Sequence, residues 1–269
     1  MCKRQTDSAV ISEAQTVAED ATYDVLGIPV SATTLSRASA RIHAWAHDGQ
    51  GRMVFIRDIH GVMQAQRNPE LMRLHQMAAM VTPDGMPLVW VGKLRHQDVD
   101  RTCGPDLMER VFADSAQTGL RHYLYGGKPG VAQKLKEVFK SKYPSVNVVG
   151  CDTPPFHPLS EDELATVAEQ INRSCADVVW IGISTPKQEL LMHDLLPRLH
   201  CTLIGVGAAY DFLIGLIKRA PGWMQRSGLE WLWRLAYEPK RLWRRYLILA
   251  PQFVWLVFRV SLVKSLSRH

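Results

Sequence analysis

Short, continuously apolar runs alternate with helical segments along most of this sequence, and this alternation constrains the fold more than any other feature. The runs have strand length and lie at residues 24–30, 53–59, 80–82, 121–126, 146–150, 177–184 and 201–207. Helical spacing covers residues 61–78, 129–142, 161–174 and 186–197, and Ser160 is a suitable N-cap for the third of these. Strands that alternate with helices form βαβ units, and continuously apolar strands are covered on both faces. The sequence therefore predicts an α/β fold with a parallel sheet.

Four glycine-containing turns directly follow predicted strands. They are PDG at 83–85, GGKPG at 126–130, GISTPKQE at 182–189 and GVGAAYD at 205–211. Open parallel sheets bind their ligands at the carboxyl ends of the strands, so all four turns are expected along one edge. This edge is the predicted binding site.

The turn at 126–130 suits phosphate. Gly126 and Gly127 allow the backbone to approach a ligand, and the N-terminus of the following helix favours phosphate oxygens. The pattern is neither a Walker loop nor GxGxxG, and a plain strand-to-helix turn fits it equally well.

The turn at 182–189 combines Gly182 with Lys187, Gln188 and Glu189 at the start of the next helix. An amide and a carboxylate there suit sugar hydroxyls or the edge of a base. A glutamate in a first helical turn is also ordinary helix-dipole chemistry.

Aspartates and one histidine are candidates for proton transfer. Asp84 follows a strand and serves as a general base if its carboxylate reaches an attacking hydroxyl; a turn aspartate without chemistry is the alternative. Asp211, after Gly207, has a similar position. His60 is a possible base or a structural histidine.

Metal chemistry has little support in this sequence. The DVD triplet at 98–100 resembles a metal-binding DxD, but it lies in a polar stretch with no strand before it. The five cysteines are scattered without a CxxC pair, so we expect free thiols and a cytoplasmic chain. The polar N-terminus has no apolar segment typical of secretion signals.

Positive charge is concentrated at the C-terminal end. From residue 218 onward, eleven Lys and Arg oppose two acids, which leaves residues 1–217 with a net charge of −3. Five of the eight tryptophans also lie in this part. We therefore divide the chain into a polar extension (1–22), an α/β core (23–216) and a helical appendage that associates with membranes (217–269).

The appendage predicts an interfacial helix rather than a spanning one. Residues 240–249 form an amphipathic helix with a basic face, Pro239 is expected to kink the path before it, and Pro251 interrupts the apolar stretch after it. A membrane span needs about 20 apolar residues. Packing on the core or on a second subunit is the alternative, and a homo-oligomer is possible.

Several of these segments together resemble the WecG/TagA/CpsF family of bacterial glycosyltransferases. The resemblance extends from Tyr23 to Tyr246, and its most specific parts are WIGISTPKQE, GVGAAYDFLIGLIKRAPGWM and EWLWRLAYEPKRLWRRY. It implies a Rossmann-like fold and metal-independent, inverting transfer of a sugar from a UDP-sugar to a lipid-pyrophosphate-linked acceptor. By this resemblance Asp84 is the base, and Arg101, Gln188 and Asp211 lie around the substrates.

One strand departs from the family pattern. Family members usually carry a T-x-N pair there, whereas this chain has Ile56 and Asp58. A hydroxyl is lost and a carboxylate gained close to the expected base. Asp58 and His60 are therefore second candidates for proton transfer.

The predicted contacts divide between the two substrates. The donor set comprises Arg101, Gly126, Gly127, Gly182, Lys187, Gln188, Glu189, Gly207 and Asp211. The set for the acceptor pyrophosphate or the membrane comprises Arg219, Arg234, Arg241, Arg244 and Arg245.

The predicted function is transfer of a hexose-type sugar to a polyprenyl-pyrophosphate-linked saccharide at the inner face of the cell membrane, for cell-surface or exopolysaccharide synthesis. We expect no cofactor and no nucleic-acid partner. The alternative is a non-catalytic protein that binds anionic lipid or nucleic acid through the basic appendage.

Overall fold

A six-stranded parallel sheet forms the centre of the molecule. The computed structural model describes residues 20–46 and 48–266, with side chains up to residue 260. The strands lie in the order β4-β3-β8-β7-β5-β6, and every neighbouring pair is parallel. Their bounds are β3 Arg52–Arg57, β4 Met80–Pro83, β5 Arg121–Gly126, β6 Asn147–Asp152, β7 Val178–Gly182 and β8 Thr202–Gly205. The predicted Rossmann-like α/β fold is confirmed.

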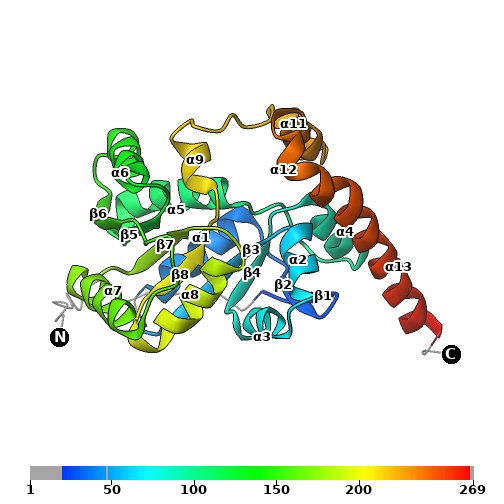
Figure 1. The fold of residues 1–269 in the computed structure, drawn as a ribbon, viewed down its shortest axis with the longest axis horizontal. Coiled ribbons are helices and arrows are strands. Elements are labelled where there is room, and N and C mark those ends of the chain that lie inside the picture. The colour runs from blue at the N-terminus through cyan, green and yellow to red at the C-terminus, as the bar shows by residue number, and fades with distance from the viewer. Residues whose placement is uncertain (1–19, 47, 267–269) are drawn as a thin grey trace.

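Helices cover both faces of this sheet, which is why its strands are apolar without alternation (Figure 1). Every residue of β4, β7 and β8 is buried. One face packs against α1 Leu35–Trp45, α5 Gly104–Thr118, α6 Val131–Lys142 and α9 Ala209–Leu213. The other packs against α2 Ile59–Ala65, α3 Pro69–Met77, α4 Met86–Leu94, α7 Glu161–Ser174 and α8 Lys187–Leu195.

Helix α7 begins where its capping residues place it. The Ser160 side chain accepts a hydrogen bond from the Glu163 amide, and Glu163 accepts one from the Ser160 amide. This reciprocal capping box satisfies two amides that a helix start otherwise leaves unpaired. A 3₁₀ turn, Leu196–Arg198, follows α8.

Two predicted elements are wrong in their extent. Residues 24–30 form no single strand, because an antiparallel hairpin of β1 Thr22–Val25 and β2 Ile28–Ser31 turns at Leu26 and Gly27. Both turn residues have positive φ, 53° and 87°, as a tight hairpin turn requires. The predicted helix 61–78 is two helices, because Asn68 caps α3 and Pro69 occupies its first position.

The C-terminal part is helical and begins with short pieces. It comprises α10 Gly222–Arg226, α11 Glu230–Tyr237, α12 Pro239–Arg244, a π-helical turn Arg245–Leu249 and α13 Ala250–Leu266. The predicted break at Pro239 is confirmed, since Glu238 has φ −131° and ψ 57°. Helix α12 continues through the π turn into α13. Pro251 lacks an amide hydrogen and lies just after this turn, where the helical ladder is already irregular.

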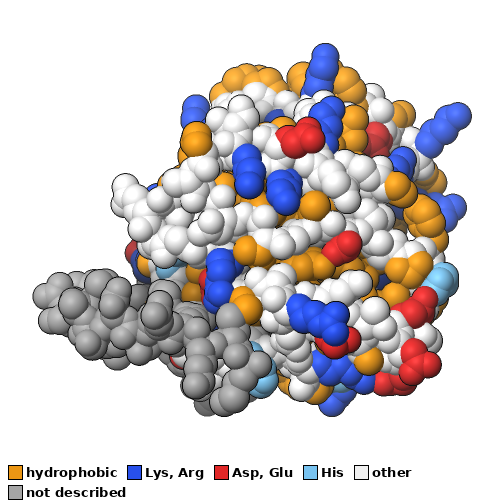
Figure 2. Space-filling model, turned by 90° about the vertical axis from the view of Figure 1, so that its left-hand side faces the viewer, with side chains coloured by type: hydrophobic (Ala, Val, Ile, Leu, Met, Phe, Trp, Pro, Cys, Tyr) orange, Lys and Arg blue, Asp and Glu red, His pale blue; other side chains and the backbone are white. Residues whose placement is uncertain are grey.

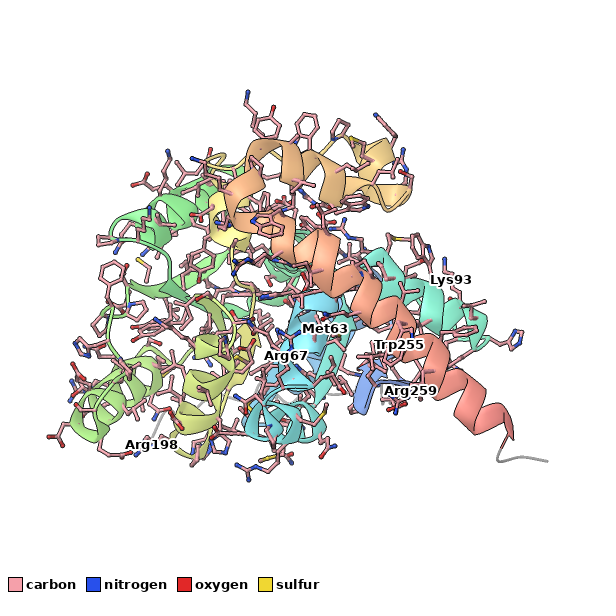
Figure 3. The ribbon with its side chains drawn as sticks, turned by 45° about the vertical axis from the view of Figure 1, so that its right-hand side comes forward. Met63, Arg67, Lys93, Arg198, Trp255 and Arg259 are labelled. Atoms are coloured by element: carbon pink, nitrogen blue, oxygen red, sulfur yellow. The ribbon has the colours of Figure 1, made fainter. Side chains whose placement is uncertain are left out.

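Helix α13 rests on α2 and then extends to the edge of the molecule (Figure 3). Phe253 is buried against the core, and Arg67 donates a hydrogen bond to Gln252 at 3.1 Å. Within the described ranges, no helix combines the length and the apolarity that a membrane crossing needs.

The cysteines only partly follow expectation. Cys103, Cys151 and Cys201 carry free thiols. Cys175 is disulfide-bonded, so the expectation of a free thiol is wrong for this residue. It ends α7 in the left-handed conformation and is half-buried.

Candidate active site at the carboxyl edge of the sheet

The chain changes direction between β5 and β7. From β5 it continues to β6 on one side, and from β7 it continues to β8 on the other. Gly126 and Gly182 face each other at the ends of these two strands. A Cβ on Gly126 would lie 2.6 Å from the Gly182 backbone nitrogen, so only glycine fits there. Such a change of direction opens a crevice at the strand ends, where sheets of this kind bind ligands.

Two further glycines of the donor set lie beside this crevice. Gly127 has φ 74° and follows Gly126 directly. Gly207, after β8, has φ 56°, and its amide donates to Gln188 Oε1 at 3.0 Å. The structure therefore brings the predicted glycines together, and whether they contact a ligand stays a prediction.

Asp84 and Arg101 form a pair at the end of β4. Arg101 Nε donates to the Asp84 carbonyl oxygen at 2.6 Å, and Arg101 Nη2 lies 3.3 Å from Asp84 Oδ1. The Asp84 side chain is recessed, but 34% of its surface stays accessible. Its carboxylate is thus held by a cation and remains open to a substrate.

The helices after residue 217 complete this cluster. Glu230 of α11 lies 2.7 Å from Arg101 Nη2, and Gln225 of α10 accepts from both Arg101 and Arg219. Arg219 also pairs with Asp106 at 2.6 Å. The predicted appendage therefore contributes side chains to the carboxyl edge of the sheet.

The charge state of Asp84 depends on these neighbours. Burial raises the pKa of its carboxyl above the usual value, Arg101 and Arg234 lower it, and Glu230 raises it further. The net pKa is raised. A carboxylate with a raised pKa is a stronger base once it has lost its proton.

Arg234 of α11 lies close enough to Asp84 to influence this pKa. Its guanidinium carbon is 5.6 Å from the centre of the Phe212 ring. Its Nε is buried, and no described residue accepts a hydrogen bond from it. A buried N–H without a partner is costly, so this position suits a ligand oxygen or a water.

The second candidates for proton transfer already have partners. Asp58 caps α2 by accepting from the Gly61 amide at 3.0 Å, and it forms an ion pair with Arg245. His60 Nε2 contacts Gln64, and burial lowers its pKa. Asp58 lies next to the Asp84 turn, since a Cβ on Gly85 would be 3.5 Å from the Asp58 Cβ.

Gln188 and Glu189 are buried beneath the edge. Glu189 forms an ion pair with Arg57, and Arg57 Nε donates to His75 Nε2 at 2.7 Å. Burial lowers the pKa of His75 to about 4, so this histidine is neutral and accepts that hydrogen bond. Gln188 donates to Glu189 at 2.8 Å. These polar atoms bind one another and hold β3, α3, α8 and the Gly207 turn together.

The remaining predicted residues lie around the cluster or away from it. Lys187 is exposed, and Asp211 is half-buried on α9. Arg241 pairs with Glu238, its side chain 61% exposed, and Arg244 lies over its neighbour Trp243. Of the five predicted acceptor arginines, Arg219, Arg234 and Arg245 lie at the carboxyl edge. Arg241 and Arg244 point to solvent.

Within the described part of the chain, no three His, Cys, Asp or Glu side chains lie close enough together to bind a metal ion. Asp98 and Asp100 of the DVD triplet instead pair with Arg37 and Lys93 on the surface.

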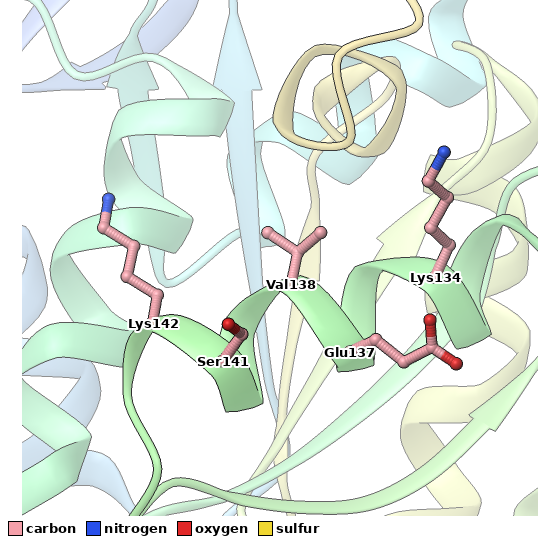
Figure 4. A pocket seen from close by; sticks show the side chains of 5 residues that line it. All are labelled: Lys134, Glu137, Val138, Ser141 and Lys142. Carbon is pink, nitrogen blue, oxygen red and sulfur yellow. The ribbon is translucent and has the colours of Figure 1, made fainter.

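A surface hollow lies apart from these groups. It has a volume of about 570 Å³ and is lined by five residues of α6 alone, Lys134, Glu137, Val138, Ser141 and Lys142 (Figure 4). None of them follows a strand, so the hollow is separate from the candidate site.

Sequence reasoning missed three of the residues around Asp84. Glu230, Gln225 and Asp106 carry no pattern that marks them, and only the fold brings them to Arg101 and Arg219.

A family model described as "Glycosyl transferase WecG/TagA/CpsF family" matches residues 23–266. The match covers both the sheet and the C-terminal helices that approach it.

Proposed function

The chain belongs to the glycosyl transferase WecG/TagA/CpsF family, and from this premise we propose that it transfers a hexose-type sugar from a UDP-sugar to a polyprenyl-pyrophosphate-linked saccharide. The transfer inverts the anomeric configuration and takes place at the cytoplasmic face of the membrane. Its product serves cell-surface or exopolysaccharide synthesis.

The Asp84–Arg101 cluster is the observation that carries this proposal. In the proposed reaction Asp84 accepts the proton of the acceptor hydroxyl while that oxygen forms a bond to the anomeric carbon. The bond from the anomeric carbon to the phosphate oxygen breaks, and UDP leaves with the electron pair. The accessible carboxylate with a raised pKa suits the first task.

The departing diphosphate needs compensation for its negative charge. Arg101 and Arg234 are the cations that lower the pKa of Asp84, and the Arg234 Nε, which has no partner among the described residues, can donate to a ligand. The β5 turn leads into the N-terminus of α6, which no side chain caps, so the first amides of that helix are further donors. Preorganised donors of this kind are worth several kcal/mol in a transition state, so we propose transfer without a metal ion.

The C-terminal helices also support action at a membrane surface. They expose many large apolar side chains, namely Trp231, Leu232, Tyr237, Trp243, Leu247, Ile248, Val254, Trp255 and Phe258. Lys240, Arg241, Arg244 and Arg259 are exposed among them. Exposed tryptophans mixed with basic residues suit a headgroup layer with anionic lipids.

The alternative is a non-catalytic protein that binds nucleic acid or anionic lipid. On the side of the molecule that carries α6 and α7, Lys and Arg are scattered among acidic and neutral side chains (Figure 2). Such a face gives no support to nucleic-acid binding away from the basic C-terminal helices, which this alternative uses. The glycine crevice and the Asp84 cluster also have no role in a pure binder.

The test is product analysis with a panel of UDP-sugars and a synthetic lipid-pyrophosphoryl sugar. We expect one UDP-sugar to be consumed, with UDP and an inverted glycosidic product formed in equal amounts. Thermal unfolding with millimolar UDP is the accompanying measurement, since a ligand that binds the native state raises its stability. Absence of both transfer and stabilisation would favour the binding protein.

A further inference from the structure

Asp152 ends strand β6 beside the glycine turn, in a position that the proposed reaction does not use. The unit β5–α6–β6 begins with a strand, passes through Gly126 and Gly127 into a helix, and returns to a neighbouring parallel strand. Asp152 is the last residue of that strand, and its Cα pairs with Tyr125, one residue before Gly126. The carboxylate therefore lies at the same edge as the glycines.

Half of the Asp152 carboxylate has a partner. The Tyr123 hydroxyl donates to Asp152 Oδ2. No described residue donates to Asp152 Oδ1, and the residue is only half-buried, so this oxygen is open to a ligand.

Two neighbours strengthen the polar character of this corner. Thr153 Oγ1 is buried, and none of the described residues forms a hydrogen bond with it. Tyr125 is neutral, since burial and the nearby Asp152 raise its pKa to about 12. An unsatisfied hydroxyl on the residue that follows a half-satisfied carboxylate suits a ligand that brings hydroxyl groups of its own.

Helix α6 adds a place for phosphate next to this corner. The helix is twelve residues long, and no side chain caps its N-terminus. Gly130 precedes it with φ 85°, and Lys128 and Pro129 of the same turn are exposed. The uncapped amides and the helix dipole favour phosphate oxygens there.

In open parallel sheets, a carboxylate at the end of the second strand of a glycine-turn βαβ unit accepts hydrogen bonds from ribose hydroxyls. We propose that Asp152 binds the ribose hydroxyls of the sugar-nucleotide donor, whose diphosphate lies at the Gly126–Gly127 turn. This inference rests on the proposed function and adds to it a residue that recognises the nucleoside.

The experiment compares UDP with 2′,3′-dideoxy-UDP, which lacks both ribose hydroxyls, by isothermal titration calorimetry on the full chain. The unmodified protein should bind UDP at least 10-fold more tightly, because each hydrogen bond to a charged group is worth about 10-fold or more. Asp152→Ala should bind UDP at least 10-fold more weakly and distinguish the two ligands less than about 2-fold.

Two further variants separate recognition from folding. Tyr123→Phe removes the donor to Oδ2 but leaves the carboxylate, so it should keep the discrimination between the two ligands. Asp162→Asn removes an exposed acid in the first turn of α7 and should match the unmodified protein. The thermal unfolding midpoint of Asp152→Ala should lie close to that of Tyr123→Phe. This measurement checks that Asp152→Ala is folded.

The outcomes distinguish the two proposals. If Asp152→Ala binds UDP and still discriminates as the unmodified protein does, the ribose assignment is wrong and the proposed function stands. If the unmodified protein binds UDP but does not discriminate, the assignment is likewise wrong. If the unmodified protein binds no UDP, both proposals fall.

Discussion

The ionisation of Asp84 is controlled by residues from three separate parts of the chain. Asp84 follows β4, Arg101 precedes α5, and Glu230 begins α11. Burial and Glu230 favour the protonated carboxyl, whereas Arg101 favours the carboxylate. The net effect raises the pKa of Asp84, and a carboxylate with a raised pKa is a stronger base once it has lost its proton.

The first prediction at this scale concerns Asp84 itself. Asp84→Asn should lower kcat by at least about 100-fold, because a positioned base acts in the transition state. UDP binding and the unfolding midpoint should stay near those of the unmodified protein. Asp100→Asn is the matched control, since that aspartate pairs with Lys93 on the surface. Turnover above about a tenth of normal in Asp84→Asn would exclude it as the base and direct attention to Asp58 and His60.

A second prediction concerns the pH dependence of activity. The base must be deprotonated, so kcat/KM should fall as the pH drops through the raised pKa of Asp84. Glu230→Gln removes a negative charge that raises this pKa. The acid limb of the profile should therefore move to lower pH.

Glu238→Gln is the control for this shift, because Glu238 pairs with Arg241 away from the cluster. Its profile should overlay that of the unmodified protein. An acid limb that stays in place or moves upward in Glu230→Gln would show that Glu230 does not set the ionisation of the base.

At the scale of elements, the helices α10 and α11 contribute side chains to the carboxyl edge of the sheet, and α12 and α13 also expose aromatic side chains. Gln225 and Glu230 contact Arg101, and Arg234 lies beside Asp84. Trp255 and Phe258 of α13 are more than half exposed. The C-terminal segment therefore contacts the carboxyl edge of the sheet through α10 and α11 and exposes aromatic side chains to solvent on α13.

The third prediction separates these parts by single arginines. Arg234→Ala should lower kcat on a short, water-soluble acceptor by at least about 10-fold, because it removes a cation from the leaving diphosphate. The double variant Arg241→Ala, Arg244→Ala should keep that kcat. It should bind vesicles with anionic lipid about 10-fold more weakly, since each basic residue contributes on the order of 1 kcal/mol there.

Deletion of residues 231–269 should reduce both properties, because it removes Arg234 together with the exposed aromatic helix. Turnover of Arg234→Ala equal to that of the double variant would restrict the whole segment to anchoring. Equal vesicle binding by the double variant and the unmodified protein would instead assign the exposed face to a second copy of the chain or to another protein.

Sequence periodicity predicted most elements of the sheet, because parallel strands covered on both faces are apolar over most of their length. Periodicity failed where a local turn or cap interrupts an element, namely at the hairpin turn Leu26–Gly27 and at the helix start Asn68–Pro69. The turns after the strands also predicted which glycines meet, since parallel strands end at one edge. Contacts such as Glu230 with Arg101 depend on how distant helices pack, and no spacing in the sequence records that.

For the whole molecule, the leaving group can be stabilised either by a bound metal ion or by cations of the protein itself. The described residues contain no acidic or histidine group arranged for an ion, and cations surround Asp84 instead. We therefore expect activity to survive thorough EDTA treatment followed by gel filtration. Loss of activity that Mg²⁺ or Mn²⁺ restores would make the DVD triplet a metal site despite its pairing with Arg37 and Lys93.

The connection between α9 and α10 has exposed residues at Gly215, Leu216 and Lys218. A protease that cuts there would separate, in one step, Glu230, Arg234 and the exposed aromatic side chains of the C-terminal helices from the sheet that carries Asp84. Under the proposed function, the remaining fragment would lose its membrane contact and the cluster around Asp84 together. A single cut would then silence misplaced copies, and this coupling would follow from the order of the chain.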